Sequence, residues 1–332
     1  MNITIIPKKI AILCSDVRKE YFPTRQAYET EKYALRDANR IAQYVKKLGG
    51  NALVIPANNK MVGCLQKYHP DIAINLVDSV AGVDSKAASI PSLLEFLDIP
   101  YTGCNTPSIA IGYDKYLVKH IMDNSSIPVP KGQLFTDDKA VLEKSLCFPL
   151  ISKLNTIHGS VGLIDDSISD SEEHLRKRIK SLLKEYPQSS VLVEEYIIGK
   201  EISVFIVEEK NTKNIYMSED TFTNSNNPYS IASFEFRWVN NNPGISINKY
   251  ESKTLERLAV AAFTALGMNG YGKFDIRKDT QGIYYFIDAN PNPTFAPPES
   301  DSPLANTALN FYNVPFLQLL STIITSGLHT KR

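Results

Sequence analysis

The sequence has few of the features that mark secreted, membrane or nucleic-acid-binding proteins. Its four cysteines form no CxxC pair, so neither a disulfide framework nor a cysteine-bound metal cluster is expected. No uninterrupted apolar run approaches the ~20 residues that a membrane-spanning helix needs. Lys plus Arg and Asp plus Glu balance at 36 each, which leaves no basic excess for binding a phosphate backbone. These absences predict a cytoplasmic protein with reduced thiols that binds neither nucleic acid nor membranes.

The chain does have enough apolar residues for several compact lobes, since 43% of its 332 residues are hydrophobic. The apolar run KIAILC at 9–14 predicts a buried strand. Apolar residues at three- and four-residue steps over 34–48, followed by a glycine pair, predict an amphipathic helix. Further strands (ALVIP, DIAINLV) and a helix (SIPSLLEFL) continue the alternation. Residues 1–112 are therefore expected to form an N-terminal lobe with a parallel sheet covered by helices.

A central lobe is expected over residues 113–205. It begins with a helix in YDKYLVKHIMDN, followed by the strand FPLISKL, the Gly/Ser-rich loop NTIHGSVG and a charged helix at 172–186. Two strand-like runs, VLVEEYI and EISVFIVEE, then follow with only a short turn between them.

A C-terminal lobe is expected over residues 206–332. It opens with Asn-rich stretches (NSNNPYS and VNNNPG) that predict a mobile loop. A helix (LERLAVAAFTAL) and two strands (GKFDIRK and IYYFIDAN) follow, and a turn at 279–282 joins the strands into a hairpin. The three lobes together predict the α/β class, with α+β character in the later lobes.

Three oxygen-bearing side chains gather in the stretch GKFDIRKDTQGIYYFIDANPNP. Asp288 and Asn290 lie two residues apart at the end of a strand, so strand alternation places both on one face. Pairing within the hairpin brings Asp275 next to them. Such oxygens suit Mg²⁺, which binds through a few protein oxygens together with substrate phosphates. The alternative interpretation is a polar strand end followed by a Pro-rich turn.

A phosphate-binding loop is the second predicted feature. Lys153 ends a strand, and Gly159, Ser160 and Gly162 follow closely. Glycines let backbone N–H groups approach phosphate oxygens, and a lysine neutralises their charge. An ordinary Gly/Ser loop has a similar composition, and His158 within it is either a phosphate or substrate contact or a solvated loop residue.

The run VEEYIIGKE is the third feature. Backbone groups at a strand end can pair with an adenine edge, and Glu194 or Glu201 could reach ribose hydroxyls. A solvated strand would show the same pattern.

In this order and spacing, the motifs resemble those of the ATP-grasp superfamily, and within it the D-alanine–D-alanine ligases and their relatives, from about Asp71 onward. The stretch IPYTGCNTPSIAIGYDKYLVKHIM is similar to the end of the family's first lobe. HGSVG is similar to its flexible phosphate loop, and VEEYI with GKE to its nucleotide hinge. The resemblance implies an ATP-grasp fold with an N-terminal α/β lobe that precedes the ATP-grasp lobes.

The resemblance also implies roles for individual residues. It implies that ATP is bound by Lys115, Lys153, Ser160, Gly162, Glu194, Glu195, Tyr196, Ile197 and Glu201. It implies that two Mg²⁺ ions, with Mn²⁺ as an alternative ion, are bound by Asp275, Asp288 and Asn290. Lys273 and the loop residues Gly159 and Ser160 are expected to act in catalysis.

Three departures from the family pattern fall on catalytic positions. The paired serines of the phosphate loop are Gly159-Ser160 here, so the serine that helps to orient the first substrate is missing. The arginine that stabilises the tetrahedral intermediate is Lys273. The metal-binding glutamate is Asp288, which is shorter by one methylene.

Other departures fall on the amino-acid-binding positions. The Lys-Tyr pair of the family's substrate loop aligns with Arg237-Trp238, and the serine that holds the acceptor carboxylate aligns with Glu299. The acidic residue of the family's first glycine-rich turn has no counterpart in SDVRKEYFPT. The ATP and metal features are thus kept, while the amino-acid-binding features are changed.

The resemblance implies an ATP-dependent carboxylate–amine ligase that forms an amide through an acyl phosphate, acting on small carboxylate and amine substrates. Three interpretations stay open. They are a D-alanine–D-alanine ligase proper, a related ligase for another acid and amine, and an ATP-binding regulator without turnover. Retention of the three metal-binding positions argues against the regulator. The resemblance also admits a homodimer.

Overall fold

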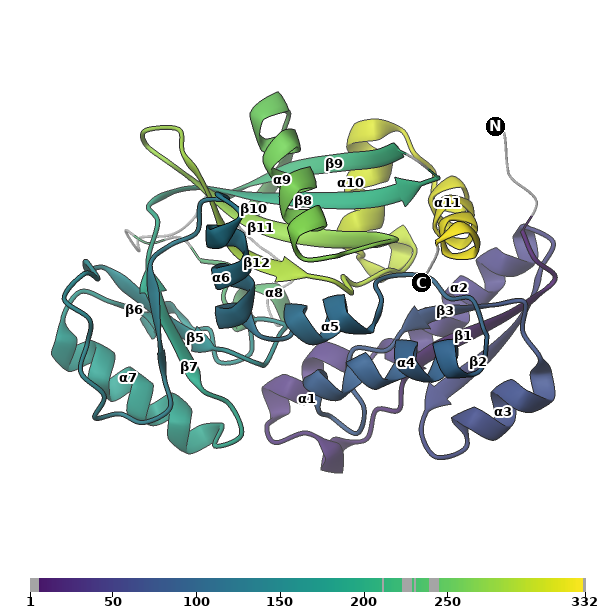
Figure 1. Cartoon of the computed structure of the whole chain (residues 1–332), viewed down its shortest axis with the longest axis horizontal. Helices are drawn as coiled ribbons and strands as arrows, with labels where there is room; N and C mark the ends of the chain where they lie inside the picture. Colours follow the sequence, from purple (N-terminus) through teal and green to yellow (C-terminus); the bar gives the residue numbers. More distant parts are fainter. Residues whose placement is uncertain (1–5, 211, 223–228, 230, 239–244, 331–332) are drawn as a thin grey trace.

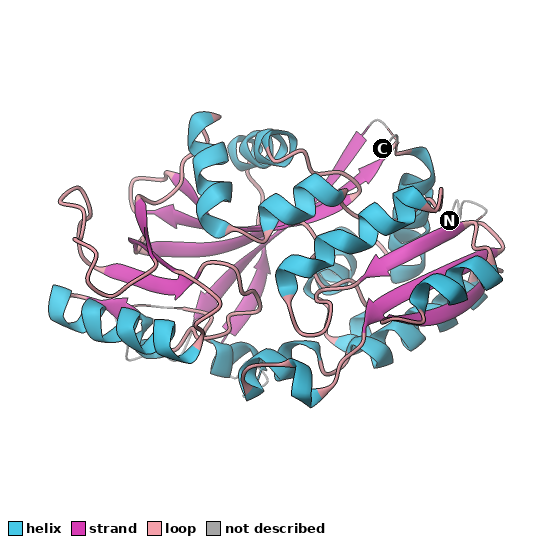
Figure 2. Cartoon of the chain, turned by 60° about the horizontal axis from the view of Figure 1, so that its bottom comes forward, coloured by secondary structure: helices cyan, strands magenta, loops and turns pink. Residues whose placement is uncertain are grey.

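The computed structural model describes residues 6–210, 212–222, 229, 231–238 and 245–330, without the side chains of Phe236 and Arg237. Three β-sheets form its interior, and most helices lie on their outer faces (Figure 1; Figure 2). This mixed architecture confirms the α/β class predicted from the sequence. Within the described ranges, no helix combines the length and the apolar character required to cross a membrane.

The N-terminal lobe contains the predicted parallel sheet. β1 (Lys9–Ser15) lies between β2 (Asn51–Ala57) and β3 (Ile72–Leu76), and both pairings are parallel. α2 (Ala34–Lys47) covers one face of this sheet, as expected from its apolar periodicity. α3 (Met61–Tyr68) and α4 (Ser89–Phe96) cover the other face.

The N-terminal lobe shares its core with the end of the chain. Phe316, Leu319 and Leu320 of α11 (Phe316–His329) belong to the same buried cluster as Ile10 and Ile72 of the parallel sheet. α10 (Pro303–Tyr312) adds Leu304, Ala305 and Ala308 to this cluster. The N-terminal and C-terminal parts are therefore packed together through one hydrophobic core.

The central lobe is built on an antiparallel sheet of order β4-β7-β5-β6. The strands are β4 (Gly132–Phe135), β5 (Leu150–Leu154), β6 (Ile168–Ser169) and β7 (Val191–Glu195). α7 (Glu172–Glu185) packs its buried side chains against this sheet, and Ser171 caps its N-terminus by accepting from the His174 N–H. α5 (Thr106–Gly112) and α6 (Lys115–Asn124) connect this lobe to the first one.

The largest sheet is antiparallel, with the order β10-β9-β8-β11-β12. Its strands are β8 (Gly199–Glu209), β9 (Thr212–Phe222), β10 (Ile245–Lys249), β11 (Tyr271–Asp279) and β12 (Tyr284–Asn290). α9 (Lys253–Ala265) buries its apolar side against one face, together with side chains of α6. Part of the opposite face packs against α10 and α11, and the rest of it lines the cavity described below.

Two features of this sheet differ from the sequence expectations. The expected boundary between residues 205 and 206 falls inside β8, because β8 pairs with β9 and β11 and not with β7. The short turn between the two strand-like runs is therefore a crossover from one sheet to another. Two strands that were not expected, β9 and β10, flank the Asn-rich stretches expected to open the last lobe, and residues 223–228, 230 and 239–244 lie outside the described residues. We propose that the last lobe begins at Gly199.

Candidate active site

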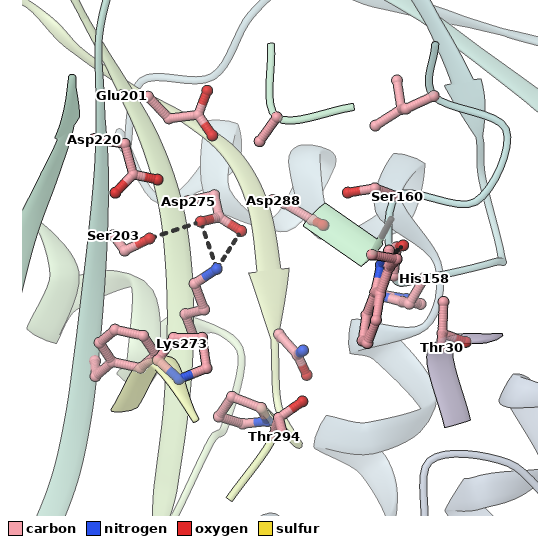
Figure 3. Close-up of a pocket in the computed structure, with 18 of the residues that line it drawn as sticks. Thr30, His158, Ser160, Glu201, Ser203, Asp220, Lys273, Asp275, Asp288 and Thr294 are labelled. Carbon is pink, nitrogen blue, oxygen red and sulfur yellow. Dashed lines mark hydrogen bonds and ion pairs between the residues drawn. The ribbon is translucent and has the colours of Figure 1, made fainter. Parts of the chain in front are cut away.

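A cavity of about 900 Å³ lies where the three sheets approach one another. One face of the largest sheet forms its floor, and residues of the predicted phosphate loop, the predicted hinge and the N-terminal lobe form its walls. Figure 3 shows Ser203, Lys273, Asp275 and Asp288 of the floor, with His158 and Ser160 of the loop and Thr30 of the N-terminal lobe. Of the singled-out residues whose side chains the structure describes, all line this cavity except Gly162. The Arg237 side chain lies outside the described part of the structure. Residues far apart in the sequence thus converge on one space.

The floor is an ordered array of side chains, because antiparallel pairing places facing residues on the same side of the sheet. Ser203 of β8 faces Asp275 of β11, which faces Asp288 of β12. In the next row, Lys273 of β11 faces Asn290 of β12. The hairpin pairing expected for Asp275 and Asp288 is therefore present.

A β-bulge aims the last residues of β12 into the cavity. Ile276 pairs with Phe286, but the preceding Asp275 pairs with Asp288, so Ile287 is an extra residue in the ladder. With regular alternation Asp288 would face Phe274 and point into the apolar core. The bulge reverses the alternation, so that Asp288 joins Asp275 on the cavity face. Alternation in the sequence does not reveal this bulge.

Asp275 is held from two sides. The Lys273 ammonium forms an ion pair with its Oδ1 at 2.7 Å, and the Ser203 hydroxyl donates to the same oxygen at 3.1 Å (Figure 3). Both the lysine and the aspartate side chains are mostly buried, with 11% and 16% exposed. These contacts fix the carboxylate on the cavity floor.

Asp288 lies among positive charges. Burial acts to raise the pKa of Asp288, but nearby positive charges, Lys115 foremost and then Lys153 and Lys273, outweigh it and lower the pKa overall. Asp288 is thus ionised and able to bind a cation at neutral pH. Its Oδ1 also accepts from the Ala289 N–H, and the Asn290 Oδ1 accepts from the Asn292 N–H.

The donor set fits a hard divalent ion. Asp275, Asp288 and Asn290 present two carboxylates and one amide oxygen on the same face, and oxygen ligands of this kind are those that Mg²⁺ takes. Within the described residues, no group of three His, Cys, Asp or Glu side chains is arranged to hold a metal. The third protein oxygen would therefore come from the amide of Asn290.

A cluster of buried lysines lies above the floor. Lys153 at β5 donates to the Ile287 carbonyl at 3.1 Å and pairs with Glu194 of β7. Lys119 pairs with the other oxygen of Glu194 at 2.6 Å, so this carboxylate lies between two lysines. Lys115, at the start of α6, donates to the Ile157 carbonyl at 2.9 Å, and burial lowers its pKa. We did not expect Lys119 to take part, although its place one turn after Lys115 on the same helix is visible in the sequence.

The phosphate loop has the backbone conformation that glycine permits. Gly159 and Gly162 have φ of +72° and +74°, in the left-handed region. A Cβ on Gly159 would approach Thr30 Cγ2 to 2.7 Å. The Trp238 indole N–H donates to the Gly159 carbonyl at 2.9 Å. The loop is thus held between Thr30 of α1 (Arg25–Glu31) and Trp238 of α8 (Phe234–Trp238).

His158 is anchored in this loop and is not a solvated residue. Its backbone N–H donates to Asp84 at 3.0 Å, and its ring packs edge-on against Tyr113. Burial lowers the pKa of His158 to about 3, so the imidazole is neutral. Its Nε2 atom is buried within the protein without a hydrogen-bond partner.

The N-terminal lobe contributes buried acidic side chains to the site. Glu31 at the end of α1 accepts from the Ser79 hydroxyl at 2.9 Å, and burial raises its pKa to about 7. Burial also raises the pKa of Asp84 to about 6 and that of Asp78 well above its usual range. Asp84 also interacts electrostatically with Lys115, so acidic and basic groups are neighbours in this site.

Glu31 is the functional candidate that the sequence analysis missed. An acidic residue was expected in the turn directly after the first strand, but Glu31 lies at the far end of an additional helix, α1, that follows this turn. The available signal was the position of Glu31 directly before the amphipathic helix α2, within the first strand-to-helix connection.

The hinge residues surround the remaining end of the cavity. Tyr196 and Ile197 follow β7, and the carboxylate of Glu195 accepts from the Cys147 N–H at 3.0 Å. Glu201 forms an ion pair with Arg277 at 2.8 Å. Arg277, like Lys119 and Glu31, was not singled out from the sequence.

Glu299 lies at the exposed rim of the cavity. Its carboxylate accepts from the Tyr44 hydroxyl at 3.1 and 3.2 Å, and its backbone carbonyl accepts from Arg40 at 2.9 Å. The side chain is therefore held toward α2 at the cavity entrance.

Comparisons with known proteins show the family of this chain. A family model described as D-ala D-ala ligase C-terminus matches residues 121–325. A D-alanine–D-alanine ligase of Halorhodospira halophila is 25% identical over 89% of this chain and 91% of its own length. One of Aquifex aeolicus is 26% identical over 88% of this chain and 94% of its own.

Solved structures show the same fold. A D-alanine–D-alanine ligase from Bacillus anthracis in complex with ATP covers 97% of both chains, with a TM-score of 0.71 and 21% identity. The VanG D-Ala:D-Ser ligase of Enterococcus faecalis covers 98% of this chain and 100% of its own, with a TM-score of 0.69 and 18% identity. These likenesses confirm the ATP-grasp fold that the sequence motifs predicted.

Proposed function

From the premise that this chain belongs to the D-alanine–D-alanine ligase family, we propose how its residues carry out ATP-dependent ligation. The enzyme is an ADP-forming, D-alanine–D-alanine ligase-like ATP-grasp ligase acting on a small carboxylate and a small amine. The observation that supports the assignment of roles most directly is the row Ser203–Asp275–Asp288, which faces Lys115 and Lys153 across one cavity.

The reaction has two steps. An oxygen of the substrate carboxylate attacks the γ-phosphorus of ATP, the bond to the β-phosphate oxygen breaks, and ADP leaves. The amine then attacks the carbonyl carbon of the acyl phosphate, loses a proton, and phosphate departs with the former carboxylate oxygen. No protein nucleophile is required.

Phosphate charge is balanced by the lysine cluster. Lys153 and Lys115 would neutralise the nucleotide phosphates, and the left-handed backbone at Gly159, Ser160 and Gly162 would turn N–H groups toward them. Lys119 would contribute to the positive charge of the cluster, because it shares the Glu194 carboxylate with Lys153. That carboxylate then neutralises the charge of Lys153 only in part. The hinge residues Glu195, Tyr196 and Ile197 would border the base.

Asp275, Asp288 and Asn290 would hold Mg²⁺, and we propose two ions, with Mn²⁺ as a substitute. When bound, the metal supplies charge stabilisation for the transferring phosphoryl group. The protein's own part is to keep these three oxygens on one face, which the bulge at Ile287 achieves.

The two substrates are proposed to occupy opposite sides of the metal-binding floor. Glu31, supported by Ser79, would accept the ammonium of the amino acid whose carboxylate is activated. Lys273 would face the oxyanion that forms when the amine attacks, together with backbone N–H groups of the loop. Trp238, bound to Gly159, would keep water from the acyl phosphate, and Arg237 is proposed to act near it.

D-alanine is the first substrate to test on both sides, because the relatives named above are D-alanine–D-alanine ligases. A ligase for a different acid and amine is the second candidate, since a carboxylate at Glu299 stands at the entrance where an acceptor would bring its own carboxylate. A homodimer and a cytoplasmic location also stay predictions.

A pairwise screen of amino acids tests this proposal. Phosphate release would be measured with ATP and Mg²⁺, and the products identified by mass spectrometry. We expect ADP, phosphate and one amide in equal amounts for at least one pair. Formation of AMP and pyrophosphate, or ATP binding without turnover for every pair, would contradict the proposed reaction.

A further inference from the structure

A buried ion pair lies at the hinge end of the cavity floor. Arg277 of β11 is directly opposite Glu201 of β8, and its Nη2 lies 2.8 Å from Glu201 Oε2. Only 3% of the arginine and 6% of the glutamate are exposed. Both residues nevertheless line the cavity, on the same face as Asp275, which lies two residues before Arg277.

Arg277 also ties this pair to the hinge. Its Nη1 donates to the Tyr196 hydroxyl at 2.7 Å and to the Ile197 carbonyl at 3.3 Å. The guanidinium lies over the Tyr196 ring, 4.7 Å from its centre. One side chain therefore connects the floor of the last lobe with the crossover between the two sheets.

Stabilisation of the fold does not by itself explain why the Arg277–Glu201 ion pair is buried. Desolvation of two charges can exceed their attraction, so a buried ion pair is weak evidence for stabilisation of the fold. The neighbouring Ile276 and Phe274 on β11 point to the other face and form the apolar core. Arg277 instead belongs to the face that a ligand would contact, which indicates a role in binding.

We propose that Arg277 is a positioning residue that makes the nucleotide subsite select ribonucleotides. It orients the Glu201 carboxylate so that this group accepts hydrogen bonds from the vicinal ribose hydroxyls, and at the same time it fixes the hinge at Ile197. A carboxylate has about four lone-pair sites, so an ion pair with one oxygen is compatible with further donors. This inference rests on the proposed ATP-dependent ligation.

The planar guanidinium suits this task. Its five N–H donors have fixed directions, so one group can hold a carboxylate, a hydroxyl and a carbonyl at once. A methionine at this position would fill similar volume without any donor, and Glu201 would lose its fixed orientation. A lysine would keep the charge but could not hold three acceptors in one plane.

The experiment compares the dissociation constants of ATP and 2′,3′-dideoxy-ATP, measured by calorimetry with Mg²⁺. For the wild type we expect a preference for ATP of roughly tenfold to a hundredfold, the size typical for losing hydrogen bonds to a charged acceptor. Arg277→Met should reduce that ratio to below about threefold, and Arg277→Lys should give an intermediate ratio. Lys249→Met is the matched control, because it removes an exposed ion pair between Lys249 of β10, in the same sheet, and Glu251, and it should leave the ratio unchanged.

A purely structural role for Arg277 would weaken the binding of both nucleotides equally, and an unchanged ratio in Arg277→Met would therefore overturn the proposal. If that variant does not fold, Glu201→Gln keeps the shape and the arginine, and it too should lose the preference. A wild-type ratio in Glu201→Gln overturns the proposal as well. ATP binding by the wild type without any preference overturns this inference alone, whereas absence of ATP binding overturns the proposed function with it.

Discussion

The ammonium of Lys273 lies between the two carboxylate oxygens of Asp275, 2.7 Å from Oδ1 and 3.0 Å from Oδ2. A residue proposed to stabilise the oxyanion thus contacts a residue proposed to bind metal (Figure 3). The lysine charge and a divalent cation would compete for the same carboxylate. Binding of metal would then release the ammonium toward the reacting carbonyl.

Lys273→Met tests this competition. Turnover should fall by roughly 10²–10³, because a positive donor near the developing charge is lost. Binding of Mn²⁺ in the absence of nucleotide should become tighter, because the ammonium no longer occupies Asp275. Electron paramagnetic resonance titration measures the free ion, and ATP affinity should stay within a few-fold. Weaker or unchanged Mn²⁺ binding would refute the competition, and unchanged turnover would remove Lys273 from the mechanism.

Asp288 should be the most sensitive position of the metal site. Asp288→Ala should lower turnover by roughly two orders of magnitude or more, because a ligand near the transferring phosphoryl group is lost. Asp288→Glu should retain much more activity, since it restores a carboxylate with one more methylene. Steady-state ADP release measures both variants, and circular dichroism controls for folding. Full activity of Asp288→Ala would exclude this residue as a metal ligand.

Glu31 should make stability depend on pH. Its pKa is raised by burial to about 7 in the folded protein, above the ordinary value of 4.5. The folded state therefore holds a proton that the unfolded state releases, and the free energy of unfolding should fall as pH rises from about 4.5 to about 7. Glu31→Gln should remove this part of the slope and be more stable at pH 8 by at most roughly 3 kcal/mol.

Glu29→Gln is the matched control on the same helix. A hydrogen bond from Lys32 lowers the pKa of Glu29, so this substitution should give no gain at neutral pH. Urea unfolding at pH 4.5, 6 and 8 provides the measurement. A Glu31→Gln variant with the wild-type slope would show that Glu31 does not hold the proton. The same variant should bind the amino-acid substrate more weakly if Glu31 receives its ammonium.

Glu299 should limit the use of acceptors that carry a carboxylate. Two carboxylates a few ångströms apart repel each other, and partial desolvation strengthens the repulsion. Glu299→Ser should therefore raise kcat/KM for D-alanine as acceptor by about threefold to tenfold. Tyr44→Phe, which removes only the hydroxyl bound to Glu299, serves as the control. If the wild type makes D-alanyl-D-alanine efficiently and Glu299→Ser does not improve this synthesis, Glu299 does not limit the acceptor. D-alanine would then be the substrate on both sides.

Much of the fold was predictable because the relevant signals are local. The apolar periodicity of α2 and the strand runs of β1, β11 and β12 depend on neighbouring residues, and each element forms where the pattern indicated. β9 was not anticipated, because its alternating polar residues carry a weak apolar signal. The residues of two consecutive strands do not show whether the strands pair with each other or enter different sheets. The crossover between β7 and β8 was therefore also missed.

In the site, too, the features that depend on local sequence were predictable and those that depend on tertiary contacts were not. That the two strands pair follows from hairpin geometry, whereas the pairing of Asp275 with Asp288 requires the bulge at Ile287, which alternation in the sequence does not reveal. Glu31 and Arg277 reach the cavity through tertiary contacts, with Ser79 in one case and Glu201 in the other. Ser79 and Glu201 lie far away in sequence from Glu31 and Arg277. The local sequence therefore does not show which groups these two residues contact.

The most direct test of the central claim follows one oxygen atom. D-alanine labelled with ¹⁸O in its carboxylate, or whichever acid the screen identifies, would be incubated with ATP, Mg²⁺ and the amine. Mass spectrometry of the released phosphate then counts the label. An acyl phosphate predicts that each phosphate carries one ¹⁸O from the carboxylate, with ADP as the other product. Labelled AMP together with unlabelled pyrophosphate would contradict the account, because the carboxylate would then have attacked the α-phosphorus.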